Sequence, residues 1–289
     1  MALSVNFVTD LQELFRYPFM QHALEAGTIV AVIAGIVGYF VVLRRSSFAA
    51  HALSHIGFAG AAGAVLFAVS PVYGLLLFTG VGGSTMAVLS PRAAHRDVHI
   101  GTVLAFMLGL GVLFISLYAG NSSQTYSILF GQILGISSSD VLLTLAAGVI
   151  ILAVVVIVYR PLLFSSLDED VAEAKGMPTF LLGIVFMLLV AVATSIAVQV
   201  VGVLLIFSLM VTPAAIAQQL AKRARTAIMI SVTIALVATW IGLSIAYYGP
   251  PYPVSFYITT LVFSFYLLVR FVYRRVRPLR ADRAILQAS

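Results

Sequence analysis

The chain has 289 residues, of which 62% are hydrophobic and only 9% are charged, and it carries a net charge of +6. Because about 25% of the residues in a soluble globular domain are charged, this composition excludes a protein with a fully water-facing surface and predicts one that lies in a membrane. The lack of cysteine in the sequence also excludes disulfides, thiolate metal sites, iron–sulfur clusters and thiol nucleophiles. Any metal chemistry must therefore use nitrogen and oxygen ligands.

Nine stretches of the sequence have the length and composition of membrane-spanning helices. A helix needs about 20 predominantly apolar residues to cross a bilayer, and charged residues, prolines or polar clusters bound each stretch. The predicted spans cover approximately residues 20–43, 48–69, 72–90, 100–119, 140–159, 179–198, 200–220, 226–247 and 254–273. Two joins, at Ser70-Pro71 and near residue 199, are so short that eight or ten spans remain alternatives. The predicted fold is an all-α polytopic transmembrane bundle of about eight to nine spans, with one transmembrane domain over residues 1–289.

The basic residues predict which way the bundle lies in the membrane. Lys and Arg in short loops stay on the cytoplasmic side. Here all of them except Arg16 follow every second span, beginning with Arg44 after the first, while the loops at the other ends of the spans carry none. The amino terminus is therefore expected outside and the carboxyl terminus in the cytoplasm. Residues 1–18 are expected to lie along the outer surface and do not resemble a signal peptide, and residues 274–289 are expected to form a cytoplasmic tail.

The first span begins with His22 and Glu25, which are three residues apart. On a helix this spacing places both side chains on one face. The two residues are a candidate entrance that attracts cations. The alternative is an ordinary polar edge at the membrane interface.

The second span carries two histidines, His51 and His55. Their spacing of four residues places two imidazoles on one helical face, where both can reach one cation. Ionisable groups inside a span are costly and indicate function by default, and of the ten acidic residues only Glu25 and Asp140 touch a predicted span. We therefore predict that His51 and His55 are metal ligands, with Ser54 beside them as a candidate pathway residue. The alternative is that the histidines only fix the packing of neighbouring helices.

The same span continues as a run of small residues, Gly57-Phe58-Ala59-Gly60-Ala61-Ala62-Gly63-Ala64. Small side chains allow the backbones of two membrane helices to approach closely. This run predicts that the second span lies at the centre of the bundle.

A strongly acidic loop separates the fifth and sixth spans. It contains four acidic residues and an alanine-rich stretch, and Gly176 and Pro178 end it. These features predict a short polar helix on the cytoplasmic face, suited to docking a partner protein; an ordinary solvated connector is the alternative. The residues of this candidate docking and coupling segment are Asp168, Glu169, Asp170, Glu173, Ala174 and Gly176. The chain has no G-x-x-x-x-G-K-[ST] motif, so any ATP must bind to another subunit.

The seventh span contains Thr212 and Pro213. Proline removes the hydrogen bond to the carbonyl of Leu209, and that carbonyl must find another partner inside the membrane. Broken helices of this kind occur along transport pathways. Thr212, Pro213 and Gln199, which precedes this span, are therefore candidate pathway residues, and a simple kink is the alternative.

Taken in order, short motifs along the chain resemble the membrane permease subunits of bacterial ABC importers for zinc, manganese and iron(II), from about Tyr17 to Arg275. The motifs are Phe19-Met20-Gln21, Leu43-Arg44-Arg45, Ala52-Leu53-Ser54-His55, Leu129-Phe130-Gly131-Gln132-Ile133-Leu134, Ala172-Glu173-Ala174-Lys175-Gly176, and Val201-Gly202-Val203-Leu204-Leu205 leading into Thr212-Pro213-Ala214-Ala215. The resemblance implies a helical bundle in the bacterial inner membrane that forms a homodimer around a central pathway. It also implies two copies of a cytoplasmic ABC ATPase and a periplasmic or lipid-anchored metal-binding protein as partners.

The resemblance assigns roles to individual residues. The pathway histidine of the family falls on His55, and the acidic residue that usually lies four positions earlier falls on His51, which is a departure. Imidazole is a softer ligand than carboxylate, so this departure favours zinc as the cargo over manganese or iron(II). The loop at 168–178 matches the segment that couples the family's permeases to their ATPase.

The expected function is therefore import of a divalent metal, with zinc preferred, by a permease that is not an enzyme, holds no permanent cofactor and binds no nucleic acid. Two alternatives remain. One is a metal carrier or channel that works without ATP. The other is an intramembrane protease that pairs Ser54 or Ser84 with a histidine, although the sequence offers no supporting third residue.

Overall fold

The computed structural model describes residues 16–89, 96–118, 131, 133–250 and 252–286, with only the helical backbone described over 272–286. All regular elements in this part of the chain are helices, which confirms the predicted all-α class. Nine of the described helices are long and apolar enough to cross a membrane. They are α2 (Pro18–Leu43), α3 (Ser47–Leu66), α4 (Pro71–Leu89), α5 (Arg96–Leu117), α7 (Ser138–Leu167), α9 (Thr179–Val201), α10 (Val203–Leu220), α11 (Ala224–Tyr248) and α12 (Val254–Leu286). Two short elements, η1 (Ile133–Gly135) and α8 (Glu169–Ala174), lie between them.

Each predicted span coincides with one long helix, and the main differences lie at the ends. Helix α7 begins with a capping box between Ser137 and Asp140 and continues through Pro161 to Leu167, beyond its predicted end at 159. Helix α12 continues to Leu286, so most of the predicted tail is an extension of the last helix. Arg160 and Pro161 marked the predicted end of α7, and the extension of α12 is strongly basic. Of the predicted surface segment 1–18, all but the last three residues lie outside the described part.

Helices α2, α3 and α9 form the most buried part of the bundle. Helix α2 packs against α7, α9, α10 and α11, while α3 packs against α4, α5, α9 and α10. Helices α5, α7 and α12 are mostly exposed and present large apolar side chains, such as Phe106, Val156 and Phe263. Such side chains suit helices that face lipid.

The small-residue run of α3 lies in close contact with α4, as its composition predicted. A Cβ atom on Gly60 would overlap the carbonyl oxygen of Gly74, and a Cβ on Gly74 would overlap the carbonyl oxygen of Gly60. Further along this contact, the hydroxyl of Thr79 on α4 lies 2.5 Å from that of Ser195 on α9. Backbone contact and a buried hydrogen bond therefore connect three neighbouring helices.

Helices α9 and α10 meet at one residue, Gly202, which has a φ of +85°. The backbone of Gly131, with a φ of +77°, lies against this join, where a Cβ would overlap Val201 and Gly202. Both positions need glycine because L-residues with side chains rarely adopt such a φ.

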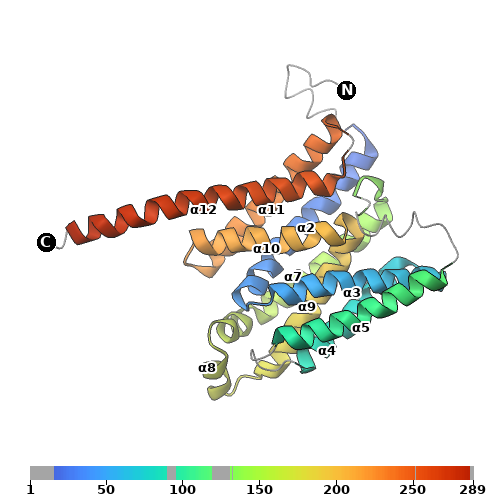
Figure 1. The fold of residues 1–289 in the computed structure, drawn as a ribbon, viewed down its shortest axis with the longest axis horizontal. Helices are drawn as coiled ribbons and strands as arrows, with labels where there is room; N and C mark the ends of the chain where they lie inside the picture. The colour runs from blue at the N-terminus through green and yellow to red at the C-terminus, as the bar shows by residue number, and fades with distance from the viewer. Residues whose placement is uncertain (1–15, 90–95, 119–130, 132, 251, 287–289) are drawn as a thin grey trace.

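Figure 1 shows α8 at the same end of the bundle as the carboxyl-terminal half of α12, while α2 begins at the opposite end. Five long described helices precede α8, and nine lie between the start of α2 and the end of α12. Because both numbers are odd, α8 and the end of α12 lie on the opposite side from the start of α2. The predicted docking segment and the end of α12 therefore lie on one side.

Candidate functional site

The two histidines of α3 lie together, as their spacing predicted. The ring centroids of His51 and His55 are 4.6 Å apart with an interplanar angle of 81°. The His51 ring also packs against Phe207 of α10, with 4.9 Å between centroids. Both histidines are partly exposed. The pair thus occupies an accessible edge of α3 beside α10.

One nitrogen of this pair has no protein partner within the described residues. The Nδ1 atom of His51 is buried and makes no hydrogen bond to any described group. Buried polar atoms usually find a partner, and an imidazole nitrogen with a free lone pair is a common metal ligand. His51 is therefore chemically suited to receive a passing cation.

The described residues contain no group of three or more His, Asp or Glu side chains that could hold a metal. The pair therefore offers at most two imidazole ligands, and other coordination positions would be filled by water or by groups outside this set. Sparse coordination favours passage over retention, since a conducted ion must also be able to leave.

Ser54 lies between the histidines in sequence but is fully buried. Its hydroxyl donates a hydrogen bond of 2.7 Å to the carbonyl oxygen of His51. A hydroxyl engaged with the backbone of its own helix is poorly placed to serve as a ligand or a nucleophile. The pathway role of Ser54 remains a prediction, and the protease alternative gains no support from this serine.

Helix α10 remains helical through Pro213, so no break occurs there, and the sequence had left a simple kink as the alternative. The boundary between α9 and α10 lies at Gly202, close to the predicted join near residue 199. Thr212 is partly exposed and Pro213 is buried. Their role in a pathway remains a prediction, while Phe207 on the same helix, which the sequence did not single out, contacts His51.

Gln199 takes part in a polar contact between α9 and α7. Its side-chain amide donates a hydrogen bond of 3.0 Å to Asp140, while its Oε1 atom is buried with no partner among the described residues. Asp140 is the acidic residue that touches the fifth predicted span. The pair gives α7 and α9 a polar contact, and the proposed pathway role of Gln199 is untested.

The two residues of the predicted entrance, His22 and Glu25, have different surroundings in the structure. The Nδ1 atom of His22 lies 3.2 Å from the carbonyl oxygen of Ile136, and because a carbonyl only accepts, Nδ1 must donate. Glu25 is exposed. His22 thus connects α2 to the segment after η1, a structural role that leaves the entrance role of both residues a prediction.

The acidic loop forms the predicted short helix, α8. The Asp168 side chain caps it by accepting a hydrogen bond of 3.0 Å from the Val171 amide. Gly176, with a φ of +78°, and the bond from the Met177 amide to the Ala172 carbonyl end it, as in a Schellman motif. Ala172 is fully buried. Helix α8 is therefore anchored to the bundle by one face.

The chain is similar along most of its length to membrane transport proteins. The ABC 3 transport family matches residues 16–273. The manganese transport system membrane protein MntC of Listeria innocua is 33% identical over 242 residues, which cover 82% of this chain and 85% of the relative. The manganese import system permease protein ScaB of Streptococcus gordonii is 31% identical over 238 residues, again covering 82% and 85%. The structure of PsaBC from Streptococcus pneumoniae in complex with Fab covers 96% of this chain and 100% of that chain, with a TM-score of 0.84 and 29% identity.

Proposed function

The chain belongs to the ABC 3 transport family, and on that premise we propose that it conducts manganese across the membrane as the permease subunit of an ATP-driven importer. Membership makes it a multi-pass metal ABC importer permease and not an enzyme, because ATP is hydrolysed by a separate subunit. The observation that supports manganese is the similarity, over most of the chain, to permeases named for manganese transport.

These relatives do not support the zinc preference that His51 suggested. Manganese prefers oxygen ligands and binds imidazole less strongly than zinc does. Two imidazoles would therefore hold manganese only briefly, which suits conduction. In this account His51 and His55 are transient ligands, and the external binding protein makes most of the choice between metals.

The remaining partners follow from the same proposal. Two copies of a cytoplasmic ATPase would dock at α8, a metal-binding protein would deliver the ion at the other end, and a second copy of this chain would complete the pathway. The basic residues that follow every second span support a cytoplasmic position for α8 and the carboxyl terminus, because Lys and Arg in short loops stay inside.

Metal competition tests the choice of cargo. The complete importer, with its ATPase and binding protein, is placed in liposomes and the initial rates of ATP-driven uptake are measured for manganese, zinc and iron(II) at equal free concentrations. We expect manganese to enter fastest. Zinc uptake faster than manganese uptake would overturn the assignment.

The variant His51→Asp tests the ligand role of His51. A carboxylate is a harder ligand that manganese prefers, so the variant should keep manganese uptake and raise the ratio of manganese to zinc uptake by about severalfold. His51→Ala should instead lower the uptake of both metals. The variant His99→Gln, on α5, controls for the loss of a histidine elsewhere and should leave the ratio unchanged. An unaltered ratio in His51→Asp would show that this residue does not contact the ion.

A further inference from the structure

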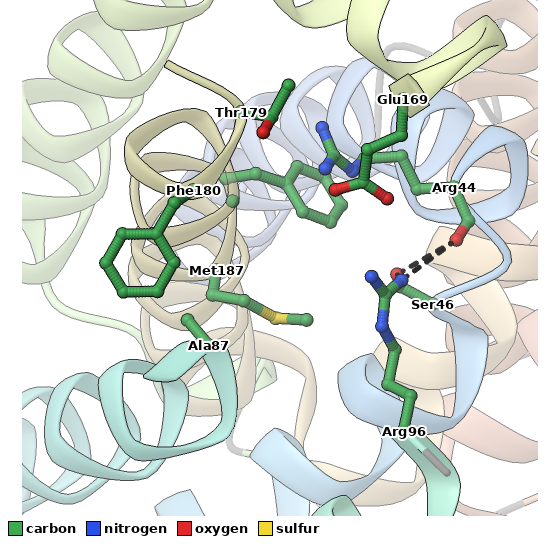
Figure 2. Close-up of a pocket in the computed structure, with 10 residues that line it drawn as sticks. Arg44, Ser46, Ala87, Arg96, Glu169, Thr179, Phe180 and Met187 are labelled. Carbon is green, nitrogen blue, oxygen red and sulfur yellow. Dashed lines mark hydrogen bonds between the residues drawn. The ribbon is translucent and has the colours of Figure 1, made fainter. Parts of the chain in front are cut away.

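Three charged side chains from separate helices converge on a small pocket beside α8 (Figure 2). Arg44 follows α2, Arg96 begins α5, and Glu169 begins α8. Figure 2 shows the Glu169 carboxylate reaching down from α8 next to Arg44, while Arg96 approaches from the opposite side. The pocket has a volume of about 20 Å³, close to the ~10–15 Å³ that one water molecule requires. The three charges therefore line one small pocket.

Other groups fix the position of Arg44. Its guanidinium lies 5.1 Å from the ring centroid of Phe186 on α9, a cation–π distance. It also donates a hydrogen bond of 3.3 Å to the hydroxyl of Ser165 on α7. Burial lowers the pKa of Arg44, the Glu169 carboxylate raises it, and Arg96 lowers it. On balance the pKa of Arg44 lies below its ordinary value because of burial, which the Glu169 carboxylate opposes.

Arg96 holds the turn between α2 and α3 from the other side. Its Nη1 atom donates to the carbonyl oxygen of Arg44 and to the hydroxyl of Ser46, both at 3.4 Å. Its Nε atom is buried with no partner among the described residues. Both arginines thus direct their described hydrogen bonds to uncharged oxygen atoms, and Glu169 is the carboxylate that lines the same pocket.

Backbone hydrogen bonds close the turn that these residues hold. Arg45 has a φ of +53°, which is uncommon for a residue other than glycine. The Ser46 amide donates to the Val41 carbonyl at 2.8 Å and the Arg45 amide donates to the Val42 carbonyl at 3.1 Å, the two bonds of a Schellman motif. Helix α3 starts immediately after this turn, at Ser47. His51 lies one turn further along.

We propose that Glu169 couples α8 to the histidine pair by attracting Arg44 and Arg96, so that a displacement of α8 shifts the α2–α3 turn and with it the start of α3. Coupling between distant sites travels through contiguous contacts of this kind. The proposal rests on the proposed function, because it takes the ATPase to act at α8. It makes Glu169, Arg44 and Arg96 positioning residues, which act on the ion through α3 and do not contact it.

A double-mutant cycle on the complete importer tests this coupling. The variants are Glu169→Gln, Arg44→Gln and the combination of the two. For each, manganese uptake and ATP hydrolysis are measured in the same liposomes, and size-exclusion chromatography reports whether the ATPase remains bound. Asp97→Asn removes an exposed carboxylate next to Arg96 and serves as the control.

We expect each single variant to keep its ATPase but to lower the amount of manganese transported per ATP by about severalfold. The double variant should transport no less manganese per ATP than either single variant, because the effects of coupled residues are not additive. Glu169→Asp, which keeps the charge, should recover most of the manganese transported per ATP.

Additive losses, or an unchanged amount of manganese transported per ATP, would overturn the coupling. Loss of the ATPase from Glu169→Gln would show instead that this residue only docks the partner. If Arg44→Gln does not assemble, Arg96→Gln takes its place in the cycle. A wild-type importer without ATP-dependent uptake would refute the proposed function itself, which is a separate result.

Discussion

Replacement of His55 by alanine is expected to lower ATP-driven manganese uptake by at least about tenfold, because changes around a metal centre typically cost about 10–100-fold in affinity or activity. His51 alone would then offer a single imidazole to the ion. Alanine is the best helix former and His55 is only partly buried, so α3 should remain intact. The measurement is the initial rate of uptake of radioactive manganese, normalised to the amount of assembled complex.

The control for this variant is Phe58→Leu, which alters the next residue on the same face of α3 without changing polarity. It should transport manganese at close to the wild-type rate. Normal uptake in a correctly assembled His55→Ala importer would leave the histidine pair as packing residues only.

Replacement of Gly74 by alanine is expected to destabilise the whole bundle. The added Cβ would overlap the carbonyl oxygen of Gly60 and crowd Ala64, so α3 and α4 would have to separate. Overpacking a closely packed contact costs about 1–3 kcal/mol, and here backbone atoms of both helices would have to move. We expect a lower melting temperature and a smaller folded fraction, measured by thermal unfolding in detergent and by size-exclusion chromatography.

Gly80 provides a matched control in the same helix. A Cβ at this position meets no atom within 4 Å, so Gly80→Ala should not lower stability, because alanine is also the better helix former. If Gly74→Ala and Gly80→Ala unfold at the same temperature, the close contact between α3 and α4 does not support the fold.

Hydropathy and length were sufficient to predict the helical class and each of the described long helices, because a spanning helix must be apolar over its whole crossing. The same criterion ended α7 too early, at Arg160 and Pro161, and missed the basic end of α12. The sequence left open whether Pro213 breaks α10 or only bends it, and α10 stays helical through this residue. The short join near residue 199 did indicate the boundary between α9 and α10, which lies at Gly202.

The histidine pair was predictable because its geometry is local: a spacing of four residues determines a shared helical face. Contacts between distant segments were not predictable in this way. In the sequence, Arg44 indicated the orientation of the chain and belonged to one family motif, but nothing related it to Arg96, 52 residues away. The structure places both arginines in one pocket with Glu169. The contact between His51 and Phe207 depends in the same way on how α3 and α10 pack.

Metal uptake with and without the ATPase tests the central claim most directly. Liposomes containing this chain, its ATPase and its binding protein are compared with liposomes that contain this chain alone, each with and without ATP inside the compartment that the ATPase faces. The account predicts manganese uptake only when both the ATPase and ATP are present. Equal manganese flux through this chain alone would contradict it and would identify an ATP-independent carrier or channel, with no coupling role for α8.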